Sequence, residues 1–157
     1  MELNQKVADF TLQTDEETTV SLSDYAGSPV VLFFYPRANT PGCTIEACGF
    51  RDAFAKLQAA GAVVLGISRD TPQTQAKFRA RYALPYTLLA DVDEKACNQF
   101  GVLKEKIMCG RKSWGIERTS FLIGPDQTLV HIFPKVKPAG HAEQVLALLE
   151  EWKKSRA

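Results

Sequence analysis

The chain has 157 residues, of which 45% are hydrophobic and 24% are charged, and its formal net charge is +1. This length and composition fit one domain, expected over residues 1–157. A charge so close to zero gives no reason to expect nucleic acid or a membrane surface as a partner. The sequence contains no apolar run of the roughly 18 residues that a membrane helix needs, and its N-terminus lacks a secretion signal. We therefore expect a cytoplasmic protein.

Two short segments near the N-terminus alternate apolar and polar residues, as half-buried strands do. They span residues 8–12 and 18–22, and the polar residues 15–17 separate them. This pattern predicts an N-terminal β-hairpin. Residues 30–35 follow as an unbroken run of apolar, strand-forming residues, which predicts a central strand covered by helices on both faces.

The middle of the chain alternates between predicted helices and strands. The first helix is expected to place Cys43 in its first turn and to run to about Ala60, because apolar residues recur at helical spacing and Gly61 can end it. Thr71 can cap a second helix, with Pro72 at its first position. The other elements predicted in this part are strands at 62–67 and 87–90 and helices at 72–82 and 93–100.

The last third of the chain has a less regular pattern. Residues 103–117 show no clean period and are expected to form a loop with some strand character. The segments 118–123 and 128–133 flank a Gly-Pro-Asp-Gln turn and predict a hairpin. A final helix is expected over about residues 140–153. Together the predicted elements indicate an α/β fold with a central sheet.

Cys43 stands where the predicted strand 30–35 passes into a helix, directly after Pro41-Gly42. At a helix N-terminus the unpaired N–H groups and the positive end of the dipole favour thiolate over thiol. A free cysteine is most often a small buried hydrophobic residue. However, α/β sheets place functional groups at strand-to-helix junctions of this kind, so the local sequence favours a nucleophilic Cys43.

Cys48 follows five residues later on the same predicted helix. In a regular helix the two Cα atoms lie roughly 8–9 Å apart, whereas a disulfide spans at most about 7 Å between Cα atoms. The spacing leaves two possibilities open. Either Cys48 is a core cysteine, or the first turns of the helix unwind so that a Cys43–Cys48 disulfide can form.

The residues around Cys43 resemble the active-site signature of peroxiredoxins. Pro36, Thr40 and Cys43 match its Pro-x-x-x-Thr-x-x-Cys pattern. The longer run over residues 40–52, which contains the second cysteine, is similar to the peroxiredoxin Q or bacterioferritin comigratory protein subgroup. The resemblance covers nearly the whole chain, through Ala-Asp-Phe at 8–10 and Arg-Thr-Ser-Phe-Leu-Ile at 118–123.

The resemblance implies a thioredoxin-like fold and a thiol peroxidase that reduces H2O2 or organic hydroperoxides. It implies that Cys43 is the peroxidatic cysteine, which attacks peroxide as a thiolate and becomes a sulfenic acid. Cys48 then corresponds to the resolving cysteine, which closes an intramolecular disulfide. The implied reductant is thioredoxin, with glutaredoxin as the alternative, and the implied enzyme is a monomer without a cofactor or metal.

Four further residues are candidates for roles in such a site. Thr40 offers a hydroxyl for hydrogen bonding with Cys43 and the peroxide, and Pro36 can shield the sulfur from water. The Arg118 guanidinium can stabilise the thiolate and the negative charge that develops on oxygen; the alternative is a sheet-edge arginine paired with an acid. Glu46 is interpreted either as a residue that orients an arginine such as Arg118, or as part of a surface salt bridge.

The remaining cysteines leave alternatives open. Cys97 lies in the predicted helix 93–100, and some peroxiredoxin Q proteins place their resolving cysteine in a later helix, so Cys97 is an alternative to Cys48. Cys109 lies in the irregular segment. A four-cysteine zinc site is a further possibility, but the close cysteine pairs of such sites are missing from the sequence. The non-enzymatic alternative to a peroxidase is a thioredoxin-like module that senses redox state or binds a metal.

Overall fold

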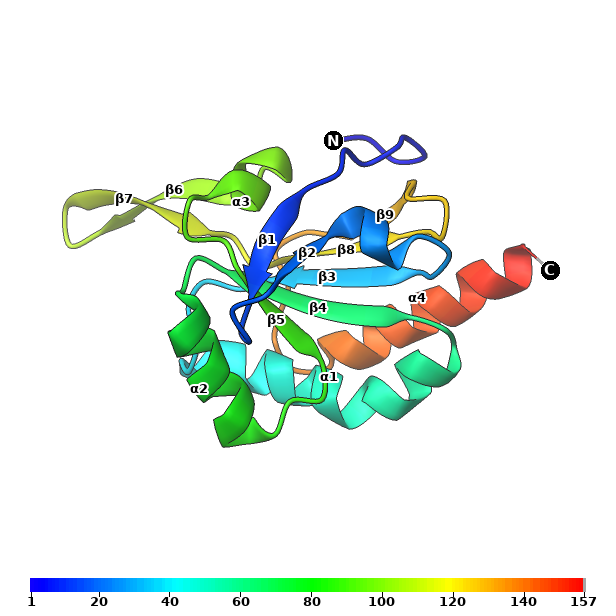
Figure 1. Ribbon diagram of the computed structural model, residues 1–157. Coiled ribbons are helices and arrows are strands. Elements are labelled where there is room, and N and C mark those ends of the chain that lie inside the picture. Colours follow the sequence, from blue (N-terminus) through cyan, green and yellow to red (C-terminus); the bar gives the residue numbers. More distant parts are fainter. Residues whose placement is uncertain (157) are drawn as a thin grey trace.

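The computed structural model describes residues 1–156. Its centre is a seven-stranded mixed sheet with the strand order β2-β1-β5-β4-β3-β8-β9. A two-stranded hairpin, β6–β7, projects from one end of the molecule (Figure 1). The predicted α/β architecture, a central mixed sheet flanked by helices, is confirmed.

The elements have the following bounds. The strands of the large sheet are β1 (Thr11–Thr14), β2 (Thr19–Ser21), β3 (Val30–Phe34), β4 (Val63–Ser68), β5 (Thr87–Ala90), β8 (Thr119–Ile123) and β9 (Leu129–Phe133). The projecting hairpin consists of β6 (Leu103–Met108) and β7 (Arg111–Ile116). The helices are the 3-10 helix η1 (Leu22–Tyr25), α1 (Pro41–Ala59), α2 (Pro72–Tyr82), α3 (Lys95–Gln99) and α4 (His141–Ser155). Strands β3, β4 and β5 run parallel to one another. Strand β1 pairs antiparallel with β5, β8 pairs antiparallel with β3, and β9 pairs antiparallel with β8.

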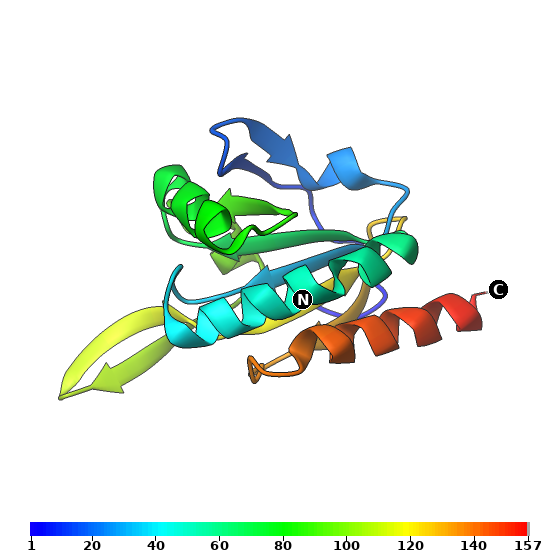
Figure 2. The same cartoon turned by 90° about the horizontal axis from the view of Figure 1, so that it is seen from below.

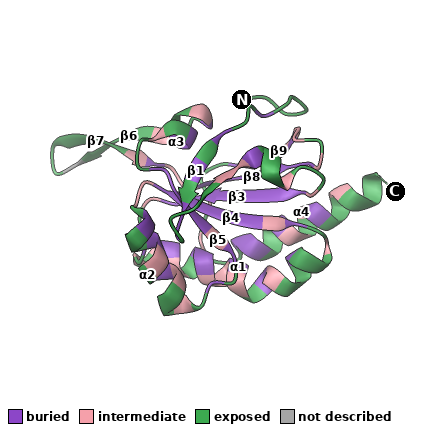
Figure 3. Ribbon diagram, viewed as in Figure 1, coloured by how far each residue is buried: buried purple, intermediate pink, exposed green. Residues whose placement is uncertain are grey.

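Strand β3 lies inside the sheet, and all five of its residues are buried (Figure 3). Successive side chains of a strand point to opposite faces. Val31 and Phe33 therefore pack in one core layer with residues of α1, α2 and α4, whereas Leu32 and Phe34 pack in the other layer with residues of α3. Figure 2 shows α1, α2 and α4 together on one face of the sheet. The prediction of a central strand covered on both faces is confirmed.

Helix α1 begins at Pro41, so Cys43 is its third residue and lies in the first turn, as predicted. Phe50 holds the helix on the sheet, because its ring stacks on that of Phe33 with the ring centroids 4.6 Å apart. Helix α2 also begins as predicted, with the Thr71 side chain accepting a hydrogen bond from the Thr74 N–H. Among the described helices, none is long and apolar enough to cross a membrane.

The N-terminal hairpin is confirmed, although its first strand begins at Thr11 rather than at residue 8. The Asp9 carboxylate accepts hydrogen bonds from the Ser23 N–H and hydroxyl at 2.9 and 2.8 Å. These contacts tie residues 8–10 to the start of the 3-10 helix instead of to a strand partner. Strand β1 also pairs with β5, so the hairpin forms one edge of the main sheet.

The prediction for residues 103–117 is only partly right: the strand character is confirmed, but residues 103–116 form the regular β6–β7 hairpin and not a loop. Its two turn residues, Cys109 and Gly110, have positive φ angles of 52° and 76°, as tight two-residue hairpin turns require. Most of the hairpin is exposed, so its strands lack the apolar–polar alternation that marks a half-buried strand. Moreover, a cysteine stands where asparagine or aspartate usually marks this turn. The sequence therefore carried little signal for the hairpin.

Candidate active site

The site begins at the carboxyl end of β3, where residues 35–40 lead into α1. Cys43 is 1% exposed in the first turn of that helix. The N–H groups of a first helical turn have no partner within the helix, and the dipole places partial positive charge there. A negative charge on the Cys43 sulfur is therefore favoured by the helix itself.

Arg118 reaches Cys43 from the short segment between β7 and β8. Its Nη1 donates a hydrogen bond to Cys43 Sγ at 3.4 Å and another to Glu46 Oε1 at 2.8 Å. The Val136 N–H donates to the Arg118 carbonyl at 2.9 Å, which fixes the backbone of this segment. The structure thus places the predicted arginine against the predicted cysteine, where its charge can stabilise a thiolate.

Gly42 permits this close approach of the arginine. A Cβ atom at Gly42 would lie 3.0 Å from Arg118 Nη2 and 3.5 Å from Pro138 Cγ. The sequence indicates only that Gly42 belongs to a turn. Its second role, leaving room for the guanidinium at the helix start, depends on a residue 76 positions further along the chain and has no local signal.

Glu46 lies one turn after Cys43, and its side chain is fully buried. The interpretation as a surface salt bridge is therefore wrong, and the buried ion pair places Glu46 where it can orient Arg118, as the alternative interpretation predicts. The second carboxylate oxygen, Oε2, is also buried and has no hydrogen-bond partner among residues 1–156. Burial raises the pKa of Glu46 from 4.5 to about 7, although the hydrogen bond and the charge of Arg118 act in the opposite direction.

Thr40 and Pro36 lie in the segment that leads into α1, and both are half-buried. The Thr40 hydroxyl donates to the Arg37 carbonyl at 2.8 Å. A hydrogen bond donated to the Cys43 sulfur, as the sequence predicts, requires this hydroxyl to rotate away from that carbonyl. The roles of Thr40 towards peroxide and of Pro36 as a shield stay predictions.

Cys48 is half-buried, and neither it nor Cys43 forms a disulfide. Helix α1 is continuous through both cysteines, so their thiols have the separation expected for a folded helix. Between them, the Ala47 carbonyl accepts a 2.6 Å hydrogen bond from the buried Tyr86 hydroxyl. Tyr86 is 39 residues from Ala47 in the sequence, and no local pattern pointed to this contact.

Comparison with known proteins bears directly on this site. A model of the AhpC/TSA family matches residues 3–132, a range that contains Cys43, Cys48 and Arg118. The chain belongs to the AhpC/TSA family. The matched residues include all strands of the main sheet except the last residue of β9.

Curated relatives of this AhpC/TSA-family chain match it along nearly its whole length. It is 48% identical over 149 residues to the putative peroxiredoxin bcp of Coxiella burnetii, which covers 95% of this chain and 99% of the relative. It is 44% identical over 142 residues to peroxiredoxin Bcp of Escherichia coli, with coverage of 90% and 91%. The resemblance to the peroxiredoxin Q or bacterioferritin comigratory protein subgroup is confirmed.

Solved structures agree with these relatives. PrxQ of Xylella fastidiosa, solved as a cysteine-to-serine mutant, has a TM-score of 0.93 at 36% identity and covers 98% of each chain. The bacterioferritin comigratory protein of Xanthomonas campestris has a TM-score of 0.87 at 39% identity and covers 90% of each chain. The AhpC/TSA-family chain therefore has the predicted thioredoxin-like fold.

Cys97 lies on the opposite side of the sheet from Cys43. Cys43 belongs to the core layer beneath α1, whereas Cys97 belongs to the layer that contains α3. The Cys97 side chain is fully buried, and this burial, reinforced by Asp91, raises the pKa of its thiol well above the usual range. Cys97 is therefore shielded, protonated and separated from Cys43 by the sheet.

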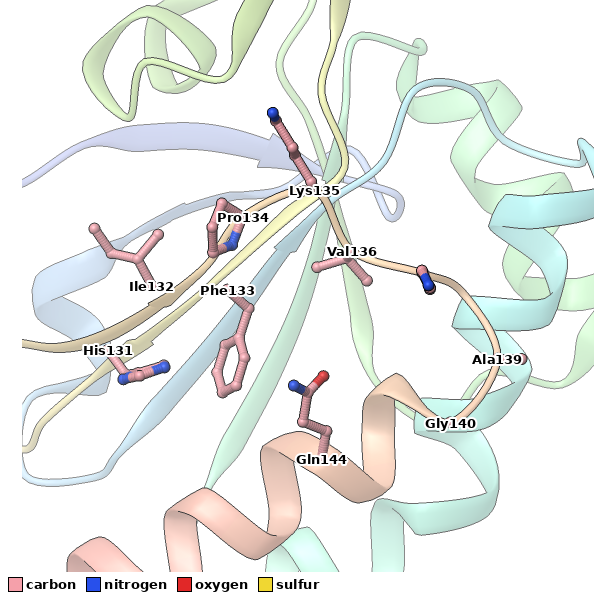
Figure 4. A pocket seen from close by; sticks show the side chains of 10 residues that line it. His131, Ile132, Phe133, Pro134, Lys135, Val136, Ala139, Gly140 and Gln144 are labelled. Atoms are coloured by element: carbon pink, nitrogen blue, oxygen red, sulfur yellow. The ribbon is translucent and has the colours of Figure 1, made fainter.

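Other features of the AhpC/TSA-family chain lie apart from the Cys43 site. A hollow between β9 and the start of α4 is lined by residues such as His131, Phe133 and Gln144, and none of the predicted site residues lines it (Figure 4). Cys109 is exposed at the tip of the β6–β7 hairpin. Within residues 1–156, no three His, Cys, Asp or Glu side chains are grouped closely enough to hold a metal ion.

Proposed function

We propose that this protein is a thiol peroxidase that reduces H2O2 and organic hydroperoxides, with Cys43 as the peroxidatic cysteine. The observation that carries the proposal is the contact between Arg118 Nη1 and the Cys43 sulfur at the start of α1. A helix N-terminus and a guanidinium both favour thiolate, which is the reactive form of a cysteine. The sequence similarity to peroxiredoxins Bcp supports the same chemistry.

In the first step the Cys43 thiolate attacks the terminal oxygen of the hydroperoxide. The O–O bond breaks, the OH group passes to the sulfur to give a sulfenic acid, and the remaining oxygen leaves as hydroxide or alkoxide, which takes a proton from solvent to become water or an alcohol. Arg118 stabilises the negative charge as it moves from sulfur to the leaving oxygen. Thr40 positions the peroxide once its hydroxyl turns from the Arg37 carbonyl, and Pro36 keeps water from the sulfur.

In the second step the Cys48 thiol attacks the sulfenic acid, which releases water and closes a Cys43–Cys48 disulfide. The intact helix holds the two Cα atoms roughly 8–9 Å apart, beyond the limit of about 7 Å for a disulfide. The first turns of α1 must therefore unwind during each cycle. Cys97 is a poor alternative, because its thiol is buried on the far side of the sheet.

The disulfide is then reduced by thioredoxin, which returns both thiols and lets the helix start refold. An intramolecular disulfide needs no second copy of the chain, so we propose a monomeric enzyme. The free thiols of this cycle persist in a reducing compartment, which supports the cytoplasm as its location. Organic hydroperoxides are included because the Xanthomonas campestris relative was studied for its alkyl peroxide reduction activity.

Replacing the resolving cysteine separates the two steps. The Cys48→Ser variant is expected to react once with peroxide at the wild-type rate and then to stop as a stable Cys43 sulfenic acid. Reduced wild-type protein mixed with one equivalent of H2O2 should instead give a peptide linked between Cys43 and Cys48. Non-reducing peptide mass spectrometry, with a sulfenic-acid trap for the variant, measures both results.

The matched control is Cys109→Ser, which removes an exposed thiol at the hairpin tip. It should keep the disulfide between Cys43 and Cys48 and full turnover. A linkage between Cys43 and Cys97, or sustained thioredoxin-dependent turnover by Cys48→Ser, would contradict the assignment of Cys48. Comparing thioredoxin, glutaredoxin and glutathione as reductants in the same assay identifies the recycling partner.

A further inference from the structure

Glu46 occupies an unusual place for an ionisable residue. It lies between the two cysteines, in the part of α1 that the proposed catalytic cycle unwinds. Its side chain is fully buried, and its Oε2 has no hydrogen-bond partner among the described residues. The segment that must unwind therefore contains a carboxyl group that is shielded from water until the helix start opens.

We propose that ionised Glu46 drives the unwinding of the first turns of α1, so that the opening of this helix depends on pH. This inference rests on the proposed function, because it assigns the trigger for the step that brings Cys43 to Cys48. When Glu46 is protonated the folded helix start is favoured, and when Glu46 is ionised the unwound form gains stability relative to the folded one.

The physical reason is incomplete compensation of a buried charge. A buried carboxylate is stabilised only when its partners satisfy both oxygens, and an unpaired buried oxygen costs free energy. Arg118 serves one oxygen of Glu46, and the same Nη1 also donates to Cys43 Sγ. One nitrogen is thus shared between two groups that carry negative charge in the reactive state. Unwinding lets water reach the carboxylate and ends this sharing of one nitrogen.

The charged and titratable groups that face Glu46 or its partner Arg118 come from different parts of the chain. Cys43 stands on the same helix, and Arg118 approaches from the segment before β8. The Tyr86 hydroxyl lies near β5, where burial, with Glu46 among the smaller contributors, raises its pKa well above the usual range. His141, at the start of α4, has a pKa lowered by burial. The tyrosine therefore stays neutral between pH 5 and pH 8, and His141 and Cys43 are the groups whose effects must be distinguished from that of Glu46.

The direction of the pH effect follows from the two states of Glu46. The folded helix start holds Glu46 with a pKa of about 7, above the ordinary 4.5. Protonation therefore favours the folded start at low pH, and this advantage is lost as the pH rises from 4.5 to 7. Above that range the effect is constant. If water reaches Glu46 fully in the unwound form, the opening equilibrium increases by up to about 300-fold.

Amide hydrogen exchange of the reduced, full-length protein tests this without relying on turnover. After correction for the intrinsic pH dependence of exchange, protection of the amides at residues 44–48, which donate the first hydrogen bonds within α1, should fall between pH 5 and pH 8. Glu46→Gln keeps the shape and removes the titration, so its protection should stay high across this range. This variant retains Cys43 and His141, and any pH dependence that it keeps belongs to those groups.

Asp52→Asn is the matched control, because it makes the same carboxylate-to-amide change at an exposed position of α1. It should follow the wild-type profile. If protection in the wild type does not change with pH, the inference is overturned, even if Glu46→Gln fails to fold. It is also overturned if folded Glu46→Gln shows the same pH-dependent fall in protection as the wild type. Neither of these results bears on peroxide consumption by Cys43, so the proposed function would stand. Conversely, peroxide turnover by a variant that lacks Cys43 would contradict the proposed function without changing the exchange profile.

Discussion

The Cys43→Ser variant is expected to lose peroxide turnover by at least about 10³-fold, because removal of a covalent nucleophile leaves only binding and electrostatic effects. A serine hydroxyl at the same helix start does not ionise at neutral pH and cannot form a sulfenic acid. Consumption of H2O2 in the presence of thioredoxin, thioredoxin reductase and NADPH measures the loss. Mass spectrometry after peroxide treatment should find no oxidised residue at position 43.

Cys109→Ser is the control for this experiment as well, because it removes a thiol that is exposed and lies at the hairpin tip. Its turnover should match the wild type. Substantial turnover by Cys43→Ser, with the fold shown intact by circular dichroism, contradicts the peroxidase proposal. In that case stoichiometric zinc in the purified reduced protein would support the alternative of a metal-binding module.

Arg118→Met is expected to impair both reactivity and stability. Loss of the guanidinium removes the donor to Cys43 Sγ, and by analogy with the loss of one oxyanion donor the reaction with peroxide should slow by about 10²–10³-fold. The same change leaves Glu46 buried without its ion-pair partner, and because a buried carboxyl without a cation protonates instead of staying charged, the loss of unfolding free energy at pH 8 should be about 1–2 kcal/mol. Single-turnover oxidation by H2O2 and urea unfolding at pH 8 measure the two effects.

A second substitution distinguishes these two roles of Arg118. Adding Glu46→Gln to Arg118→Met removes the unpaired buried carboxyl, so the double variant should recover most of the lost stability but none of the lost rate. Arg111→Met, at an exposed position of β7, is the control and should change neither quantity. A wild-type oxidation rate in Arg118→Met contradicts the role of Arg118 in stabilising the thiolate and the transition state.

The parts of the fold that the sequence predicted well are those with a strong local pattern. The apolar run at β3 and the helical spacing after Cys43 each reflect burial in the core. Turn residues and a cap identified the starts of α1 and α2 in the same way. The β6–β7 hairpin has no such pattern, since most of it projects into solvent and neither of its faces is sorted by burial.

The site residues also differ in whether a local sequence pattern marks them. Cys43, Cys48 and Thr40 lie in one short motif, and Arg118 belongs to a second recognisable segment, so sequence alone could name them. The burial of Glu46 and its unpaired oxygen depend on how α1 and the segment before β8 meet. Tyr86 and Gly42 matter through contacts with residues far along the chain. Properties of this kind arise from packing and have no signature in a short stretch of sequence.

The two-layered core also restricts which disulfides the chain can form. Four cysteines can be fully paired in three ways, and exchange among such isomers is a common source of inactive, mispaired protein. Here the sheet separates Cys97 from Cys43, and the six-residue strands of the hairpin carry Cys109 about 20 Å beyond their base. Cys48 is the one thiol that shares a helix with Cys43. The folded chain therefore disfavours disulfides from Cys43 to Cys97 or Cys109 and leaves Cys48 as the partner within reach once the helix start opens.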